Sequence, residues 1–357
     1  MKMDRTFYQP VLEVTRGGIV ESIHGGAAAI VDVSGQLLAW YGDPGVVTFL
    51  RSSAKPFQAL PFMEHGGAEH YQLTSPEIAL ICSSHSGTDE HVKVVQGIQA
   101  KTRVSEGDLM CGTHDPIHEP TSRMLIERHE QPTPNRHNCS GKHTGMLAYI
   151  RMNAGMQAGQ LPYIDFSHPL QKEILQSFAE MCDLTIDQVI VGIDGCSAPN
   201  FAVPLRNAAL AYARLAAAVE TGTAAAPRVA ACRLIASSMI ENPEMVGGPG
   251  RFDTALMQTC PGKVVSKGGA EGYHGVGILP GVLGPGSPAL GIAVKIMDGD
   301  ARGTACSAFT LAVLRELGAL SGKEQEALAG FGPSLQLYNF RKLHVGEVRP
   351  CFSLSRS

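Results

Sequence analysis

The only Ser-x-x-Lys motif of the chain lies within Phe49-Leu50-Arg51-Ser52-Ser53-Ala54-Lys55-Pro56, where a strand-rich N-terminal region gives way to helices. Residues three apart on a helical turn are neighbours, so we expect Ser52 and Lys55 to share one face. A serine hydroxyl becomes a nucleophile when a base takes its proton, and a lysine amine kept neutral by burial or a second cation is such a base. The motif therefore favours Ser52 as nucleophile and Lys55 as base. So short a pattern also fits a serine and a solvated lysine at a helix start.

Strand-like patterns occupy both ends of the chain and helical patterns its middle. Residues 11–41 are short apolar runs separated by Gly-Gly and Ser-Gly turns, which predicts an antiparallel meander. The middle of the chain has mainly helical spacing or composition, apart from an irregular stretch at residues 110–136. Strands at both ends with helices between them imply one sheet built from both termini, with a helical insert. The later strands are expected at residues 263–269, 275–279, 290–297 and 339–348.

The predicted fold class is α/β, of the α+β type, with a mostly antiparallel sheet flanked by helices. We expect residues 1–54 and 245–357 to form the sheet-containing domain and residues 55–244 a mainly helical domain, with the active site in the cleft between them. The Ala-rich stretch at residues 209–226 has the composition of a linker, but its larger apolar residues recur at helical spacing and predict an amphipathic helix.

Composition excludes several classes of function. The chain has 357 residues, 44% of them hydrophobic, which is enough for a sizeable core. A net charge of -4 and 6% aromatic residues supply neither a basic stripe nor a stacking platform, so no nucleic-acid partner is expected. The apolar runs are too short to span a membrane and residues 1–10 contain no apolar leader, which favours a cytoplasmic protein without a membrane partner. Nine scattered cysteines fit reduced core residues better than a disulfide framework.

Two further short motifs contain the residue types of a serine hydrolase. Ser84 lies in the loop Ser83-Ser84-His85-Ser86-Gly87, and Lys267 precedes Gly268-Gly269. Each motif is weak by itself. With the first motif they give the order Ser-x-x-Lys, Ser-x-Ser, Lys-Gly-Gly, which parallels that of serine β-lactamases and penicillin-binding proteins. In that layout the second lysine lies at the edge of a strand and faces the nucleophile.

Several longer motifs in register make the similarity specific to one family. With them the chain resembles the rhizobial-type (class 3) L-asparaginases from about Val11 through Gly299 and onward to Val348. The resemblance implies a β-lactamase/glutaminase-like architecture and sets the chain apart from the threonine-dependent bacterial asparaginases. The motifs are Leu50-Arg51-Ser52-Ser53-Ala54-Lys55-Pro56, Cys82-Ser83-Ser84-His85-Ser86-Gly87, Asn138-Cys139-Ser140-Gly141-Lys142-His143 and Asp194-Gly195-Cys196.

The resemblance implies a role for each of these residues. Ser52 with Lys55 and Ser84 with Lys267 correspond to two Ser-Lys pairs, in which Ser52 attacks and the second pair relays protons. The forked guanidinium of Arg51 suits a substrate carboxylate. A salt bridge that orients the turn at Ser52 is an alternative role for Arg51. The residues implied to bind the substrate are Arg51, His143, Asp194 and Gly268.

A zinc ion beside the substrate is also implied by the resemblance. Cys139, Lys142 and Cys196 fall where the family binds zinc, with a water as the fourth ligand. Without the resemblance, two cysteines so far apart in the sequence predict only core packing. A lysine ligand is unusual because its amine must be neutral. The implied role of the zinc is structural or substrate-positioning, not activation of water.

The implied reaction is the hydrolysis of the side-chain amide of L-asparagine to L-aspartate and ammonia through a Ser-Lys acyl-enzyme. Glutaminase activity stays open, because one methylene group gives only about 1–3 kcal/mol of discrimination. A β-lactamase-like serine hydrolase and a catalytically silent zinc or amino-acid binding protein are further alternatives. The lack of a leader disfavours the former, and the intact Ser and Lys residues disfavour the latter. The resemblance also suggests a homodimer.

Overall fold

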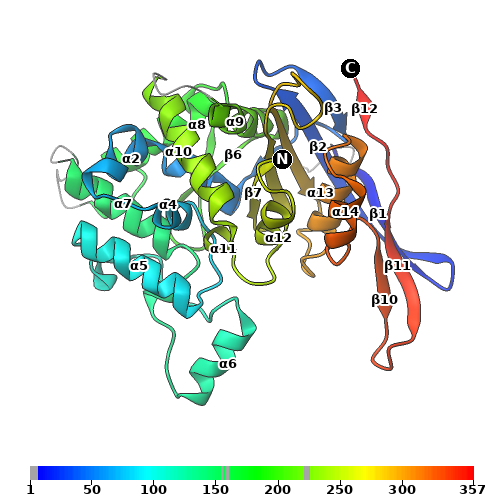
Figure 1. Ribbon diagram of the computed structural model, residues 1–357, viewed down its shortest axis with the longest axis horizontal. Coiled ribbons are helices and arrows are strands. Elements are labelled where there is room, and N and C mark those ends of the chain that lie inside the picture. The colour runs from blue at the N-terminus through cyan, green and yellow to red at the C-terminus, as the bar shows by residue number, and fades with distance from the viewer. Residues whose placement is uncertain (1–6, 154–155, 157–160, 221–225) are drawn as a thin grey trace. The chain divides into compact units, whose positions relative to one another are not determined.

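The computed structural model describes residues 7–153, 156, 161–220 and 226–357 (Figure 1). The chain divides into two compact units. No helix in the described ranges is both long and apolar enough to cross a membrane. The first unit comprises Met1–Ser53, Ala202–Ala217 and Thr259–Ser357, and the second comprises Ala54–Phe201 and Ala218–Gln258.

A nine-stranded antiparallel sheet forms the framework of the first unit (Figure 1). Seven strands follow the order β10-β11-β1-β2-β9-β8-β7, while β3 pairs with β2 and β12 with β3. Strand β2 from the N-terminal part pairs with β9 from the C-terminal part, which confirms one sheet built from both ends of the chain. The strands are β1 (Gln9–Arg16), β2 (Ile19–Asp32), β3 (Leu37–Tyr41), β7 (Val264–Gly269), β8 (Tyr273–Ile278), β9 (Leu290–Ile296), β10 (Leu335–Tyr338), β11 (His344–Pro350) and β12 (Ser355–Arg356).

Helix α9 (Leu205–Ala217) packs with its backbone close to strands β2, β8 and β9. The helix and the strands can approach this closely because many of the residues in contact are glycine or alanine. A Cβ atom at Gly291 would overlap the carbonyl oxygen of Ala209, and one at Gly277 would lie 2.7 Å from the carbonyl oxygen of Tyr212. Glycines on the strands and alanines on the helix therefore let helix and sheet backbones touch. Helices α13 (Ala305–Glu316) and α14 (Gly322–Ala327) complete this unit.

Replacing Gly291 by alanine is expected to lower the free energy of unfolding by about 1–3 kcal/mol or more, because the new methyl group must push α9 off the sheet. The midpoint of thermal unfolding measures the effect. The matched control is Gly330→Ala, whose added Cβ meets no atom within 4 Å and is expected to leave the midpoint nearly unchanged. Equal midpoints for the two variants would contradict the close packing.

The second unit is mainly helical, with α4 (Ser75–Ile81) at its centre in contact with α5, α7, α10 and α11. A Cβ atom at Gly141 would overlap the carbonyl oxygen of Leu80, and one at Gly145 would lie 2.8 Å from Ile81, so α7 crosses α4 closely. This crossing holds the start of α7 against the end of α4. The other elements are α1 (Lys55–Gln58), α2 (Leu60–Glu64), α3 (Gly67–His70), α5 (Asp89–Thr102), α6 (Glu119–Glu127), α7 (Ser140–Met152), α8 (Pro169–Met181), β5 (Ile190–Ile193), α10 (Pro227–Glu241), α11 (Pro243–Val246) and α12 (Phe252–Thr259).

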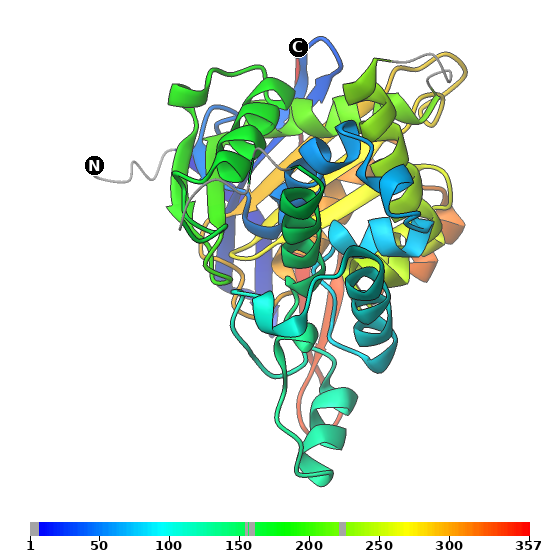
Figure 2. The ribbon, with the colours of Figure 1, turned by 90° about the vertical axis from the view of Figure 1, so that its left-hand side faces the viewer.

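Two predicted stretches differ from the structure. Residues 110–136 were expected to be irregular but contain α6, which has Pro120 in its first turn and stands apart from the other helices of its unit (Figures 1 and 2). The strand expected at residues 339–348 is instead the turn between β10 and β11 followed by β11 itself. The turn forms because the side-chain oxygen of Asn339 accepts from two following backbone N–H groups.

The division into units also differs from the predicted domains in two places. Helix α9 belongs to the first unit, because its small residues pack on the strand glycines, and residues 245–258 belong to the second unit. Of the Ala-rich helix predicted at residues 209–226, the structure places α9 and a short 3-10 helix (Ala218–Glu220), and residues 221–225 lie outside the described residues. The expected cleft between the domains stays a prediction.

Candidate active site

Ser52 lies in a strained turn of the first unit. Strand β4 (Val47–Phe49) leads into a 3-10 helix (Arg51–Ala54), and the N–H of Ser53 donates to the carbonyl oxygen of Leu50 at 3.1 Å. Arg51 has a φ of 53°, in the left-handed region that non-glycine residues avoid. Such a conformation costs about 1–3 kcal/mol and persists only where the surroundings enforce it. The turn leaves Ser52 partly exposed.

Lys267 and Gly268 lie beside this turn in the same unit. Lys267 is fully buried on strand β7, and its backbone carbonyl accepts from the hydroxyl of Ser53 at 2.5 Å. The Nζ atom of Lys267 donates to the carbonyl oxygen of Gly268 at 2.7 Å. The fold thus brings the first and third sequence motifs together. Arg51 lies 3.9 Å from the carboxylate of Glu271, and so exposed a pair contributes little.

Lys55 and Ser84 meet in the second unit. Lys55 is buried at the start of α1, and Ser84 lies in the loop after α4. The Nζ atom of Lys55 contacts the hydroxyl of Ser84 at 2.9 Å and donates to the carbonyl oxygens of Ser83 at 2.6 Å and Asn138 at 3.1 Å. Carbonyls can only accept, so a neutral amine would give both its N–H groups to them and could receive a proton from the Ser84 hydroxyl. The Lys55–Ser84 contact is therefore suited to proton transfer.

The predicted pairs Ser52 with Lys55 and Ser84 with Lys267 each combine residues of different units, and they stay predictions.

Cys139, Lys142 and Cys196 come together in the second unit, all of them buried. The first two flank the start of α7 and Cys196 lies in the turn after β5. Lys142 Nζ donates to the Cys196 sulfur at 3.1 Å. A hydrogen bond from the Cys139 thiol, aided by the Lys142 charge, lowers the pKa of Cys196 despite its burial. The same contact and burial raise the pKa of Cys139.

The chemistry of this donor set fits the implied zinc ion. Sulfur and nitrogen donors in a buried site are those that tetrahedral zinc takes, and the lowered pKa of Cys196 favours the thiolate form that binds a metal. Burial alone would lower the pKa of Lys142, but the neighbouring thiolate charge outweighs it and raises that pKa, so the amine must lose a proton to bind. Among the residues that the structure describes, no group of three or more His, Cys, Asp or Glu side chains could hold a metal. The candidate zinc ligands Cys139, Lys142 and Cys196 are not such a group, because one of the three is a lysine.

His143 follows Lys142 on α7 and is held by Tyr163. The hydroxyl of Tyr163 accepts from the N–H of Met110 at 2.8 Å and lies 2.7 Å from His143 Nδ1, which holds the imidazole ring in place. Burial lowers the pKa of His143, although an interaction with the Cys196 side chain and the charge of that residue oppose the shift. Within the described part of the chain, Nε2 makes no hydrogen bond of normal geometry.

Asp194 is set by the turn that ends β5. Its backbone N–H donates to the carbonyl oxygen of Ala198, and its carboxylate accepts from the N–H of Gly195 at 2.9 Å. Its negative charge helps to raise the pKa of Lys142, so it belongs to the same electrostatic cluster. Asp194 and Cys196 both lie in the turn that follows β5.

His85 is a buried support for the loop that carries Ser84. Its Nδ1 accepts from the N–H of Gly87 at 3.2 Å, and its Nε2 lies 2.9 Å from the hydroxyl of Ser140. A proton added at Nδ1 would face an N–H group. Burial, with the charges of His91 and Lys55, lowers the pKa of His85 well below 6.5.

This shift predicts that the protein loses stability in acid. Below about pH 6.5 His85 is protonated in the unfolded chain but not in the folded chain. The free energy of unfolding therefore decreases as the pH is lowered. The expected loss between about pH 7.5 and about pH 5.5 is about 1.4 kcal/mol for this group. Urea unfolding at the two pH values measures it. His85→Gln should remove this contribution to the pH dependence of the free energy of unfolding. The control His129→Gln, at an exposed position, should retain it.

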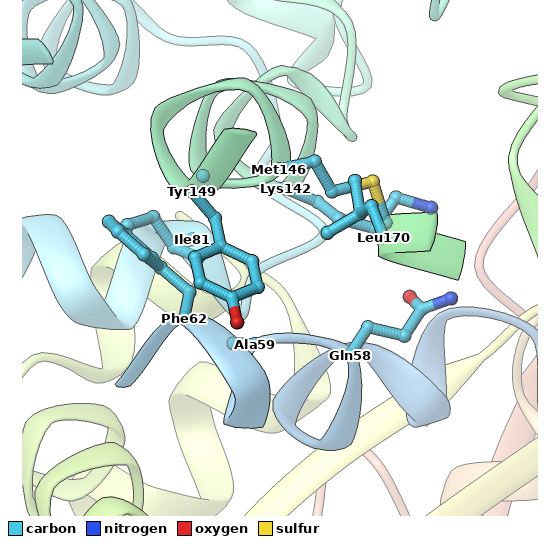
Figure 3. A pocket seen from close by; sticks show the side chains of 9 residues that line it. Gln58, Ala59, Phe62, Ile81, Lys142, Met146, Tyr149 and Leu170 are labelled. Atoms are coloured by element: carbon cyan, nitrogen blue, oxygen red, sulfur yellow. The ribbon is translucent and has the colours of Figure 1, made fainter. Parts of the chain in front are cut away.

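A small cavity beside the cysteine cluster does not hold the substrate. Its volume is about 10 Å³, which is room for a single water molecule. Figure 3 shows Lys142, Met146 and Leu170 on one side of it and the rings of Phe62 and Tyr149 on the other.

Sequence reasoning missed two residues of these clusters, Tyr163 and Tyr212. Tyr163 stands in a stretch without a motif, and Tyr212 is one of several residues at helical spacing in the Ala-rich helix. Both act through a hydroxyl that bonds a distant segment. No local signal distinguishes such tyrosines from core residues.

A profile of the L-asparaginase II family matches residues 12–350, which is nearly the whole chain. The protein is therefore an amidohydrolase, and it belongs to the L-asparaginase II family. No curated protein sequence matches the chain.

Similar solved structures include a Bacillus glutaminase in the presence of 4.3 M NaCl, with 13% identity, a TM-score of 0.39, and coverage of 82% of this chain and 91% of that chain. A probable glutaminase from Bacillus subtilis complexed with 6-diazo-5-oxo-L-norleucine has 13% identity, a TM-score of 0.37, and coverage of 82% and 84%.

Proposed function

We propose that the protein hydrolyses L-asparagine to L-aspartate and ammonia through an acyl-enzyme on Ser52. The observation that carries the proposal is the buried contact of Lys55 Nζ with the Ser84 hydroxyl at 2.9 Å. Lys55 itself lies three residues after Ser52 in the chain. An amine in this position can take a proton from one hydroxyl and exchange it with another. Together with membership of the family, this favours a serine hydrolase mechanism.

In the proposed first step, Lys55 takes the proton of Ser52 while its oxygen attacks the side-chain amide carbon of asparagine. The resulting oxyanion accepts from backbone N–H groups at the Ser52 turn and at Gly268-Gly269. Ser84 and Lys267 relay a proton to the leaving nitrogen, the C–N bond breaks, and ammonia departs. Water then attacks the β-aspartyl ester, and its proton returns Ser52 to the hydroxyl form.

The residues proposed to bind the substrate offer partners for its charged ends. Arg51 would bind a carboxylate through its forked guanidinium. Asp194 would accept from the α-ammonium group, and the Nε2–H of His143 would donate to a substrate oxygen. The lowered pKa of His143 and the contact of its Nδ1 with Tyr163 support this last role.

We infer that zinc, when bound, is held by Cys139, Lys142 and Cys196 and supplies a positive charge that helps to position the substrate. Removing it with a chelator is expected to raise KM for asparagine about tenfold or more while changing kcat less, because the proposed nucleophile is a serine. Steady-state kinetics before and after dialysis against the chelator measure this, with zinc added back as the control. Complete loss of kcat would favour a metallohydrolase instead.

A coupled ammonia assay on asparagine and glutamine tests the proposed reaction directly. We expect release of ammonia from asparagine, and the ratio of kcat/KM for the two amides gives the preference between them. A chromogenic β-lactam tests the β-lactamase-like alternative. If the folded, zinc-loaded protein binds asparagine but releases no ammonia, it is a binding protein and not an asparaginase.

The cytoplasmic location and the homodimer also belong to the proposal. The family resemblance supports the dimer, and light scattering of the purified protein would show a mass of about twice that of the chain.

A further inference from the structure

Two buried residues that the proposed chemistry does not use connect the Ser52 turn to the strand that carries Lys267. Ser53 Oγ donates to the carbonyl oxygen of Lys267 at 2.5 Å. Tyr212 Oη donates to the carbonyl oxygen of Ser53 at 2.7 Å and lies 2.7 Å from Ser53 Oγ. Both side chains are completely buried, where hydrogen bonds are least weakened by water.

The direction of these bonds follows from the groups involved. A backbone carbonyl can only accept, so the Ser53 hydroxyl must be the donor to Lys267 and the Tyr212 hydroxyl the donor to Ser53. Helix α9 is thereby bonded to the turn, and the turn is bonded to strand β7. The three segments are far apart in the sequence but belong to the same unit.

The ring of Tyr212 is fixed on the side of the sheet that Lys267 occupies. A Cβ atom at Gly275 would overlap this ring, so the ring fills the space of the missing side chain. Gly275 pairs with Lys267 across strands β7 and β8. Cross-strand partners point to the same face of a sheet, so Tyr212 and the Lys267 side chain lie on one face.

The turn itself needs such support. Arg51 is held in the left-handed region, and a Cβ atom at Gly269 would overlap the carbonyl oxygen of Leu50. The strained turn is thus pressed against the end of β7 on one side and bonded through Ser53 on the other. Without these bonds the turn could relax to a conformation without a positive φ.

We propose that Ser53 and Tyr212 are positioning residues that hold the Ser52 turn in place relative to Lys267. The proposal rests on the proposed role of Ser52 as nucleophile. It explains why a tyrosine hydroxyl is buried in helix α9, whose other buried residues are leucines and alanines. A displacement of about 1 Å at a reacting group lowers the rate about 100-fold, so a loosened turn reduces kcat more than substrate binding.

Tyr212→Phe tests this proposal because it removes one oxygen and keeps the ring over Gly275. We expect kcat for asparagine to fall about 10- to 100-fold with KM nearly unchanged. In hydrogen–deuterium exchange, the peptide that covers Leu50–Ser53 should exchange about fivefold faster. The matched control is Tyr41→Phe, which loses a similar bond from a tyrosine hydroxyl to the backbone carbonyl of Pro10. It should change neither kcat nor exchange at the turn.

A second variant separates positioning from a loss of stability. Ser53→Ala breaks the bond to Lys267 and should lower kcat by a similar factor, and the double variant should lose little more, because both residues belong to one network. A merely structural role would lower the thermal midpoint and leave kcat of the folded protein intact.

Each outcome decides the proposal. Unchanged exchange at the turn in Tyr212→Phe overturns it, and so does faster exchange with unchanged kcat. If Ser52→Ala keeps its turnover, the proposed function fails, and the exchange data still decide whether Tyr212 and Ser53 hold the turn.

Discussion

Ser52→Ala is expected to lower ammonia release from asparagine by about 10,000-fold or more while the protein stays folded. The change removes the proposed attacking oxygen, and no acyl-enzyme can form without it. The side chain is partly exposed at the turn, so its loss removes little packing. The measurement is kcat in the coupled ammonia assay, with circular dichroism and the thermal midpoint showing that the fold persists.

The matched control for this variant is Ser167→Ala, which removes an exposed hydroxyl from the second unit and should keep full activity. Turnover of folded Ser52→Ala within tenfold of the original protein would show that the nucleophile lies elsewhere. Ser84, whose hydroxyl contacts Lys55, would then be the next residue to replace.

Lys55→Met is expected to lower kcat by about 10,000-fold, because it removes the base and leaves the Ser52 proton in place. Methionine keeps most of the length of the buried side chain but cannot donate. The carbonyls of Ser83 and Asn138 each lose a donor, which should cost about 1–3 kcal/mol of stability apiece. Kinetics are therefore measured well below the lowered thermal midpoint.

Two comparisons make the Lys55 result specific. Ser84→Ala removes only the relay partner of Lys55, and we expect a smaller fall in kcat of about 100-fold with little change in stability. Lys93→Met makes the same charge change at an exposed position of α5 and should leave kcat unaltered. A folded Lys55→Met variant that turns over normally would exclude this lysine as the base.

The parts of the proposed site that the sequence predicts are those whose residues lie close together along the chain. The proposed roles of Ser52, Lys55 and Ser84 rest on short local motifs, and the strand pattern at both chain ends led correctly to one sheet. The meeting of Cys139 with Cys196 depends on how α7 and the turn after β5 pack, so it could be expected only from the family resemblance.

What the sequence could not predict depends on contacts between distant segments. Tyr212 has the same helical spacing as its apolar neighbours, and only the seating of α9 on the strand glycines brings its hydroxyl to Ser53. The same packing moved α9 into the first unit, contrary to the predicted domains. The left-handed φ of Arg51 is also invisible in the sequence, because arginine gives no sign of that conformation.

The direct seating of α9 on glycines has a consequence for motion. Helices that pack through long side chains can slide past a neighbour by changing rotamers, but here main chain rests on main chain and has no such freedom. We therefore expect α9 and strands β8 and β9 to shift together as one rigid block. A rearrangement of the first unit during turnover would then leave the geometry between α9 and these two strands unchanged.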